Sequence, residues 1–191
     1  MEYVYELNLP PASEIFLNSF TGFDDSYELP FNYQYREDID KIFNPEWLTF
    51  KGIRWELVLF FRKNNFEGKI HTDIPVKLMK TKLAEIYTPW GITWVWDGPG
   101  RLEYWNFEDL DEDYVTTGAF NTDKGKVWTY LNKTPPAKTY NLEPNHVYLV
   151  NGRQPHKATG WNHRKTISYR TLDKPFTPWT NIVEKFQDII I

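Results

Sequence analysis

The chain has 191 residues, of which 41% are hydrophobic and 25% charged, and its formal net charge is −4. These values are typical of one globular domain that buries its own core, and they exclude a disordered chain. Cysteine is absent, which excludes a disulfide scaffold, thiolate metal sites and a cysteine nucleophile. No apolar run reaches membrane-spanning length, and the first residues lack the pattern of a signal peptide, so we expect a cytoplasmic protein that does not enter a membrane.

The aromatic content is high, with 9 Trp, 12 Tyr and 13 Phe, and the 13 Pro and 10 Gly supply many turns. Aromatic and β-branched residues favour strands, so the composition predicts a mainly β fold. The acidic sequence pI of about 5.6 argues against a nucleic-acid partner that is bound by charge.

The predicted elements are short strands separated by turn residues, followed by one helix. The segment 97–100 (Asp-Gly-Pro-Gly) predicts a hairpin between two of the strands. Apolar residues at a helical spacing predict a C-terminal helix over about 180–190, with Asn181 as its N-cap and Glu184 completing a capping box. Strands are predicted at 52–62, 69–73, 92–96, 101–105, 127–131, 146–150 and 164–170, an order that favours an antiparallel barrel or sandwich.

Two further features have two interpretations each. The charged run 108–113 is expected to be a solvated acidic loop, with a lid or substrate-selecting rim as the alternative. Trp94 and Trp96 share one face of a predicted strand and either fill the core or line a pocket.

His71-Thr72-Asp73 is the first motif that carries chemistry. On a strand, residues i and i+2 point to the same side, so the imidazole of His71 and the carboxylate of Asp73 can converge. With a third ligand they would form the two-histidine, one-carboxylate set of non-haem Fe(II) oxygenases, whereas alone they can also be a surface ion pair. The candidates for the third ligand are His146, His156 and His163.

The strand predicted at 164–170 carries the second motif. Alternation places Arg164, Thr166, Ser168 and Arg170 on one face. Guanidinium groups beside hydroxyls suit an anionic dicarboxylate, and the alternative is an ordinary polar face turned to solvent.

Taken together, the H-x-D motif, the distal histidine and the late arginine strand resemble the Fe(II)/2-oxoglutarate-dependent dioxygenase superfamily between about Gly52 and Arg170. The resemblance implies a double-stranded β-helix (jelly-roll) core with flanking helices, in one domain over 1–191 with its core at about 45–172. It implies His71, Asp73 and His156 as iron ligands and catalytic residues. It also implies that Arg164 binds the 2-oxoglutarate carboxylate.

The short spacing from His156 to Arg164 is similar to the prolyl-hydroxylase branch. The Arg164-x5-Arg170 spacing is partly similar to the AlkB-type demethylases, in which both arginines contact 2-oxoglutarate, and Ser168 lies between them. The expected activity is hydroxylation of a peptidyl side chain or a small molecule with Fe(II), 2-oxoglutarate and O2. The alternatives are an AlkB-like demethylase and a non-catalytic binding module.

Overall fold

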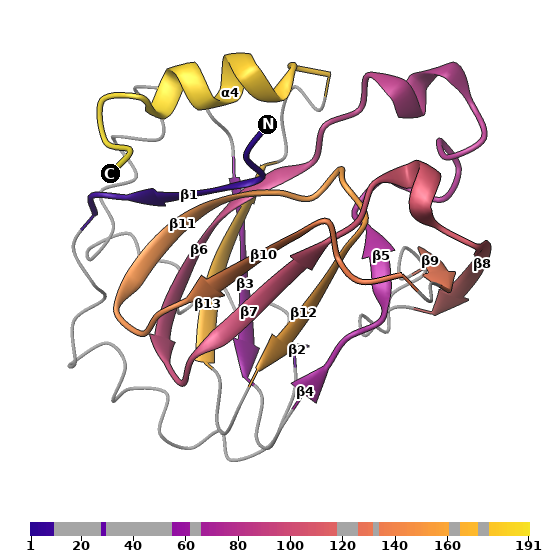
Figure 1. The fold of residues 1–191 in the computed structure, drawn as a ribbon. Helices are drawn as coiled ribbons and strands as arrows, with labels where there is room; N and C mark the ends of the chain where they lie inside the picture. Colours follow the sequence, from indigo (N-terminus) through magenta and orange to yellow (C-terminus); the bar gives the residue numbers. More distant parts are fainter. Residues whose placement is uncertain are drawn as a thin grey trace.

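The computed structural model describes residues 1–9, 28–29, 55–61, 66–117, 126–131, 134–160, 165–171 and 176–191. In these residues the chain is mostly β, with two antiparallel sheets and one C-terminal α-helix (Figure 1). The expectation of a mainly β fold with a C-terminal helix is confirmed. No helix within the described ranges has both the length and the apolar character needed to cross a bilayer.

The first sheet, called sheet A here, contains six strands in a non-sequential order. Its central strands β6 and β13 pair with each other, and a register shift interrupts their ladder between Lys165 and Thr166. In spatial order the strands are β1 (Val4–Leu7), β11 (His146–Asn151), β6 (Trp90–Asp97), β13 (Lys165–Thr171), β3 (Trp55–Phe61) and β2 (Glu28–Leu29).

The second sheet, sheet B, contains seven strands, one of which, β4 (Phe66–Glu67), lies off the main strand order and pairs with β12. The other six are, in spatial order, β10 (Lys138–Leu142), β7 (Gly100–Tyr104), β12 (His156–Gly160), β5 (Ile70–Thr72), β9 (Lys126–Leu131) and β8 (Glu112–Thr117). Successive strands therefore alternate between the sheets in several places, which brings residues distant in sequence into one ladder.

The predicted hairpin between 92–96 and 101–105 is wrong. The turn exists, and Gly98 adopts the left-handed conformation (φ 70°) that glycine tolerates best. However, β6 pairs in sheet A with β11 and β13, whereas β7 pairs in sheet B with β10 and β12. The turn at 97–100 therefore carries the chain from one sheet to the other instead of closing a two-stranded ladder.

The two sheets enclose a hydrophobic core. Side chains from both sheets meet in one buried cluster, including Val95 and Tyr148 from sheet A and Leu102 and Tyr104 from sheet B. Alternation along β6 places Thr93 on the same inner face as Val95. The inner surface of sheet A thus carries polar as well as apolar side chains.

The opposite face of sheet A meets α4 (Trp179–Phe186). Trp90, Ile92 and Trp94 alternate onto this face and are all buried, and the rings of Trp90 and Phe186 pack edge to face with centroids 5.4 Å apart. Trp94 is therefore a packing residue on the face turned away from sheet B, and not the wall of a pocket between the sheets.

The C-terminal helix is shorter than predicted and begins differently. Pro178 occupies the N-cap position and makes no side-chain capping bond, so the predicted Asn181 cap is wrong. Asn181 lies inside the helix. Beyond the helix, Ile190 forms a β-bridge with Leu7, so the last residues extend along β1 instead of continuing the helix.

The acidic segment 108–113 is only partly a loop. Phe107–Asp109 forms a 3-10 turn, and β8 begins at Glu112. Glu108, Asp109, Asp111 and Asp113 are exposed, which agrees with the prediction of a solvated segment.

Candidate metal centre

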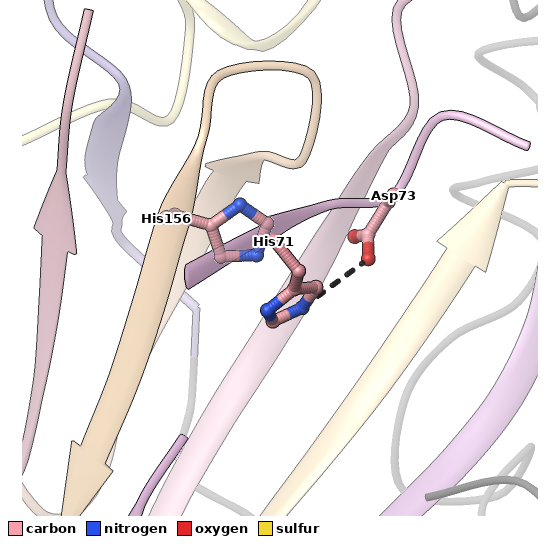
Figure 2. Close-up of side chains that lie close together, drawn as sticks. All are labelled: His71, Asp73 and His156. Atoms are coloured by element: carbon pink, nitrogen blue, oxygen red, sulfur yellow. Dashed lines mark ion pairs between the residues drawn. The ribbon is translucent and has the colours of Figure 1, made fainter. Parts of the chain in front are cut away.

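His71 and His156 are brought together by sheet B. His71 lies in the middle of β5, and His156 is the first residue of β12 and stands directly opposite it in the antiparallel register. Side chains of directly opposed residues project from the same face of a sheet. The two imidazole rings accordingly lie with their centroids 4.5 Å apart, and Figure 2 shows them beside each other.

Asp73 lies one residue beyond the end of β5, where the ladder no longer holds the chain. Its backbone N–H instead donates to the carbonyl of Gly152, at 2.9 Å, in the turn between β11 and β12. Gly152 also lies against the Asp73 side chain, because a Cβ atom at Gly152 would overlap Asp73 Oδ2 and stand 3.0 Å from its Cγ. The Asp73 carboxylate can therefore lie where it does because Gly152 has no side chain.

These three residues form a compact group of potential metal ligands. One ligand atom from each of His71, Asp73 and His156 can be chosen so that all lie within 4.8 Å of one another. His156 is 6% exposed, whereas the side chains of His71 and Asp73 are 26% and 22% exposed. The group is thus buried on the His156 side and open on the other, an arrangement that allows a small molecule to reach it.

The ring nitrogens of both histidines have defined roles. His71 Nδ1 lies 2.8 Å from the carbonyl oxygen of Lys69, and His156 Nδ1 lies 2.9 Å from that of Gln154. Because a carbonyl oxygen only accepts hydrogen bonds, each Nδ1 carries the proton and donates it. In the neutral rings, both Nε2 atoms then keep a lone pair that can bind a metal, the usual arrangement for ligating histidines.

The donor set fits a divalent metal ion. Two imidazole nitrogens and one carboxylate on the same side of an ion are the set found in non-haem Fe(II) sites. His71 Nε2 already lies 3.8 Å from Asp73 Oδ1, the two atoms joined by the dashed line in Figure 2. Two ligands of one ion are at most about 4.2 Å apart, twice a typical bond length, so small rotations of the side-chain torsions would close the site around an ion.

The negative charge of Asp73 affects two tyrosines. Burial, assisted by this charge, raises the pKa of Tyr104 well above its usual value and also raises the pKa of Tyr87. Both shifts have the same cause, because burial and a nearby negative charge disfavour the phenolate form.

The other predicted site residues have different positions. His146 opens β11 in sheet A and its Nδ1 lies 2.7 Å from Glu6 Oε1, so it does not join the group. His163 and Arg164 lie outside the described residues.

Arg170 lies in β13 opposite Gly91. Ser168 is buried, and its hydroxyl lies 2.9 Å from that of Thr93 on the inner face of sheet A. Its burial, together with that of Thr166, is inconsistent with a solvent-facing polar face at these two positions.

Sequence reasoning missed two residues that shape the group. Gly152 was visible only as part of an Asn-Gly turn signal, and its contact with Asp73 spans many residues of sequence. Tyr104, whose ring lies 5.6 Å from that of His156, looked like any aromatic residue of a strand. Only the spatial register reveals either role.

Comparisons with known proteins do not assign a family. No family model matches the chain, and no curated protein matches it. A solved structure of E. coli ycfD superimposes with a TM-score of 0.44 and 12% identity, over 81% of this chain and 34% of ycfD, so the chain spans about a third of that protein. Hydroquinone 1,2-dioxygenase PnpCD, solved with Cd2+ and 4-hydroxybenzonitrile, gives a TM-score of 0.22 and 13% identity, over 72% of this chain and 66% of that one. Likenesses this weak carry no argument about activity.

Proposed function

We propose that this protein is an Fe(II)- and 2-oxoglutarate-dependent dioxygenase with a metal centre formed by His71, Asp73 and His156. The observation that carries the proposal is the convergence of two imidazoles and one carboxylate, with each histidine donating from Nδ1 to a backbone carbonyl. If His71 and Asp73 formed only a surface ion pair, the Nε2 atoms of both histidines would not need to stay unprotonated and available to one shared ligand.

Each residue has a distinct task in this proposal. His71 and His156 bind the ion through Nε2, and Asp73 neutralises part of its charge. When bound, iron together with 2-oxoglutarate and O2 supplies the oxidising chemistry, which couples decarboxylation of 2-oxoglutarate to succinate with hydroxylation of a substrate. The buried side of His156 excludes water from the protein side of the ion, and the exposed side of His71 leaves room for ligands that are not protein side chains.

We further propose that 2-oxoglutarate is held by β13 and the residue before it. The planar guanidinium of Arg164 or Arg170 suits the distal carboxylate. Ser168 and Thr93 share one hydrogen bond, which uses only one of their two hydroxyl protons. The second proton remains to donate to a carboxylate on the inner face of sheet A.

The same proposal extends to the architecture and the substrate. The order of strands supports a jelly-roll core, since β3, β6, β11 and β13 lie in one sheet and β5, β7, β10 and β12 in the other. We propose that residues 1–191 form one such domain, and that it hydroxylates a peptidyl side chain or a small molecule. The acidic pI remains the argument against nucleic acid.

The test is an anaerobic titration with Fe(II) and 2-oxoglutarate, followed by the weak visible charge-transfer band of the iron–2-oxoglutarate chelate. The wild-type protein should develop the band, His71→Ala should lose it, and the matched control His146→Ala should keep it. His146 is suitable because its partner is Glu6 in sheet A. A wild-type protein without the band, or a band that survives His71→Ala, would contradict the proposal.

The 2-oxoglutarate contacts need a separate test. Arg164→Ala and Arg170→Ala each leave the three metal ligands in place, so metal affinity should be unchanged in both. The variant that lacks the main carboxylate contact should need more 2-oxoglutarate to reach half of the full band. Equal titration curves for both variants and the wild type would show that neither arginine binds 2-oxoglutarate.

A further inference from the structure

We infer that Tyr104 is a positioning residue for the metal centre, which holds His156 with its ring and Asp73 through its hydroxyl. The inference rests on the proposed metal centre and concerns a residue that contacts no metal itself. It follows from four contacts of Tyr104, none of which the sequence reveals.

The first contact is between Tyr104 and His156. Tyr104, the last residue of β7, stands directly opposite His156 in the register, and the ring centroids are 5.6 Å apart with an interplanar angle of 33°. Tyr104 is completely buried, so its ring cannot move aside without opening the core. The imidazole of His156 thus has Tyr104 on one side and His71 on the other.

The second contact links Tyr104 to Asp73. The Tyr104 hydroxyl donates to the carbonyl of Asn151 at 3.1 Å. Asn151 ends β11 and directly precedes Gly152, whose carbonyl accepts the Asp73 N–H and whose Cα lies against the carboxylate. A single hydroxyl therefore fixes, from sheet B, the sheet A turn that places Asp73.

The remaining contacts hold Tyr104 itself. Its ring packs against those of Tyr3 and Tyr140, with centroids 5.0 and 5.7 Å away. The Tyr3 carbonyl also accepts the backbone N–H of Asn151 at 2.9 Å. The N-terminal residues therefore support both ends of the bridge between Tyr104 and Asn151.

The packing of the Tyr104 ring and the hydrogen bond of its hydroxyl can be tested separately. Phenylalanine fills nearly the same volume, and burying a hydroxyl is costly unless it finds a hydrogen-bond partner. The partner found here is the carbonyl next to Gly152 rather than a group elsewhere in the core.

The experiment compares Tyr104→Phe with Tyr148→Phe. Tyr148 is also buried in the core, but its hydroxyl accepts the backbone N–H of Glu143 and has no role near the metal centre. The readouts are the dissociation constant for Co(II) alone, the visible d–d spectrum of the bound Co(II), and the denaturant stability of the metal-free protein. Tyr104→Phe should weaken Co(II) binding about tenfold and shift the d–d bands, as loss of a group that orients a ligand does.

Tyr148→Phe should leave the affinity and the spectrum unchanged, even where its stability loss equals that of Tyr104→Phe. The inference is overturned if Tyr104→Phe loses stability while its Co(II) affinity and spectrum stay at the wild-type values. If Tyr104→Phe does not fold, Tyr3→Leu is tested in its place, because it removes a ring that packs against Tyr104. Unchanged Co(II) binding by Tyr3→Leu would also overturn the inference.

The controls separate this inference from the proposed function. A wild-type protein that binds no Co(II) would contradict the metal centre itself, and the positioning role would fall with it. A wild-type protein that binds Co(II), with Tyr104→Phe binding equally well, would contradict only the role of Tyr104.

Discussion

The strands β7 and β12 carry two different polar arrangements on their two faces. On the outer face, Glu103 accepts from Arg101 at 3.0 Å and from Lys157 at 3.1 Å, and the Lys157 ammonium lies 5.7 Å from the Trp105 ring centroid. Each charge there meets an opposite charge. The inner face carries the neighbouring residues of the same strands. There Tyr104 lies opposite His156, and His156 forms a group with the imidazole of His71 and the carboxylate of Asp73.

The two faces differ as a structural network of ion pairs differs from a candidate metal site. On the outer face, the carboxylate is flanked by two cations, so the group gains nothing by binding an ion. On the inner face, both histidines donate away from the centre to carbonyls and keep lone pairs toward it. Substitutions on the outer face should therefore change stability alone, and those on the inner face should change metal binding.

The largest effect is expected for Asp73→Asn, which removes the charge but keeps the shape of the side chain. Metal binding needs the carboxylate charge, so affinity for Co(II) measured by calorimetry should fall at least about 100-fold. The stability of the metal-free protein should change little, because the His71 and Asp73 side chains are partly exposed and their closest atoms are 3.8 Å apart. An Asn variant that binds the ion as well as the wild type would remove Asp73 from the site.

The next largest effect is expected for Gly152→Ala. The added methyl group overlaps Asp73 Oδ2, so the carboxylate must rotate away and Co(II) affinity should fall about 10- to 100-fold. The double variant with Asp73→Asn gives the control: because both changes act on one carboxylate, the double variant should bind no worse than Asp73→Asn alone. Additive losses would show that Gly152 acts by another route.

A smaller effect, on stability alone, is expected for Glu103→Gln, the outer-face counterpart of Asp73→Asn. Glutamine keeps the volume but leaves Arg101 and Lys157 without their common carboxylate. The free energy of unfolding should fall by about 1–2 kcal/mol in denaturant titrations, with Co(II) affinity unchanged. Weaker metal binding in this variant would mean that the two faces are coupled.

The effect with the narrowest range of conditions is expected for Tyr130→Phe and is seen only at high pH. Tyr130 alternates onto the face of sheet B away from His71, and burial raises its pKa from 10.0 to about 12. The raised pKa contributes stability that is present below pH 10 and is lost as the pH rises toward 12, because the unfolded chain loses the proton first. Tyr130→Phe should show a shallower loss of stability between these pH values and unchanged Co(II) binding at neutral pH.

Local sequence signals found most of the strands but not how they pair. The segment around Ile92 is apolar and bounded by turns, so it was predictable as a strand. No local signal indicated that the next strand, β7, belongs to the other sheet. The missed strands are short or carry many polar residues, and they include Val4–Leu7, Glu112–Thr117, Lys138–Leu142 and His156–Gly160. Pairing depends on contacts between distant residues, which periodicity does not report.

The candidate site was predictable to different extents. The i, i+2 spacing of His71 and Asp73 indicated convergence directly, but the residues left three histidines open, and only the resemblance favoured His156 over His146 and His163. The supporting roles of Gly152 and Tyr104 depend on the turn between β11 and β12 meeting the end of β5. Such an encounter follows from the whole fold and has no local signature.

The direct opposition of His71 and His156 has a consequence for the folded chain as a whole. The chain has no cysteine, so no disulfide can join its distant segments. An ion bound by His71, Asp73 and His156 would tie together two stretches that are far apart in sequence, and β5, with only three residues, would gain most from that cross-link. Loading with metal would then stabilise the folded state by mass action, so the ion would serve as a reversible substitute for a disulfide.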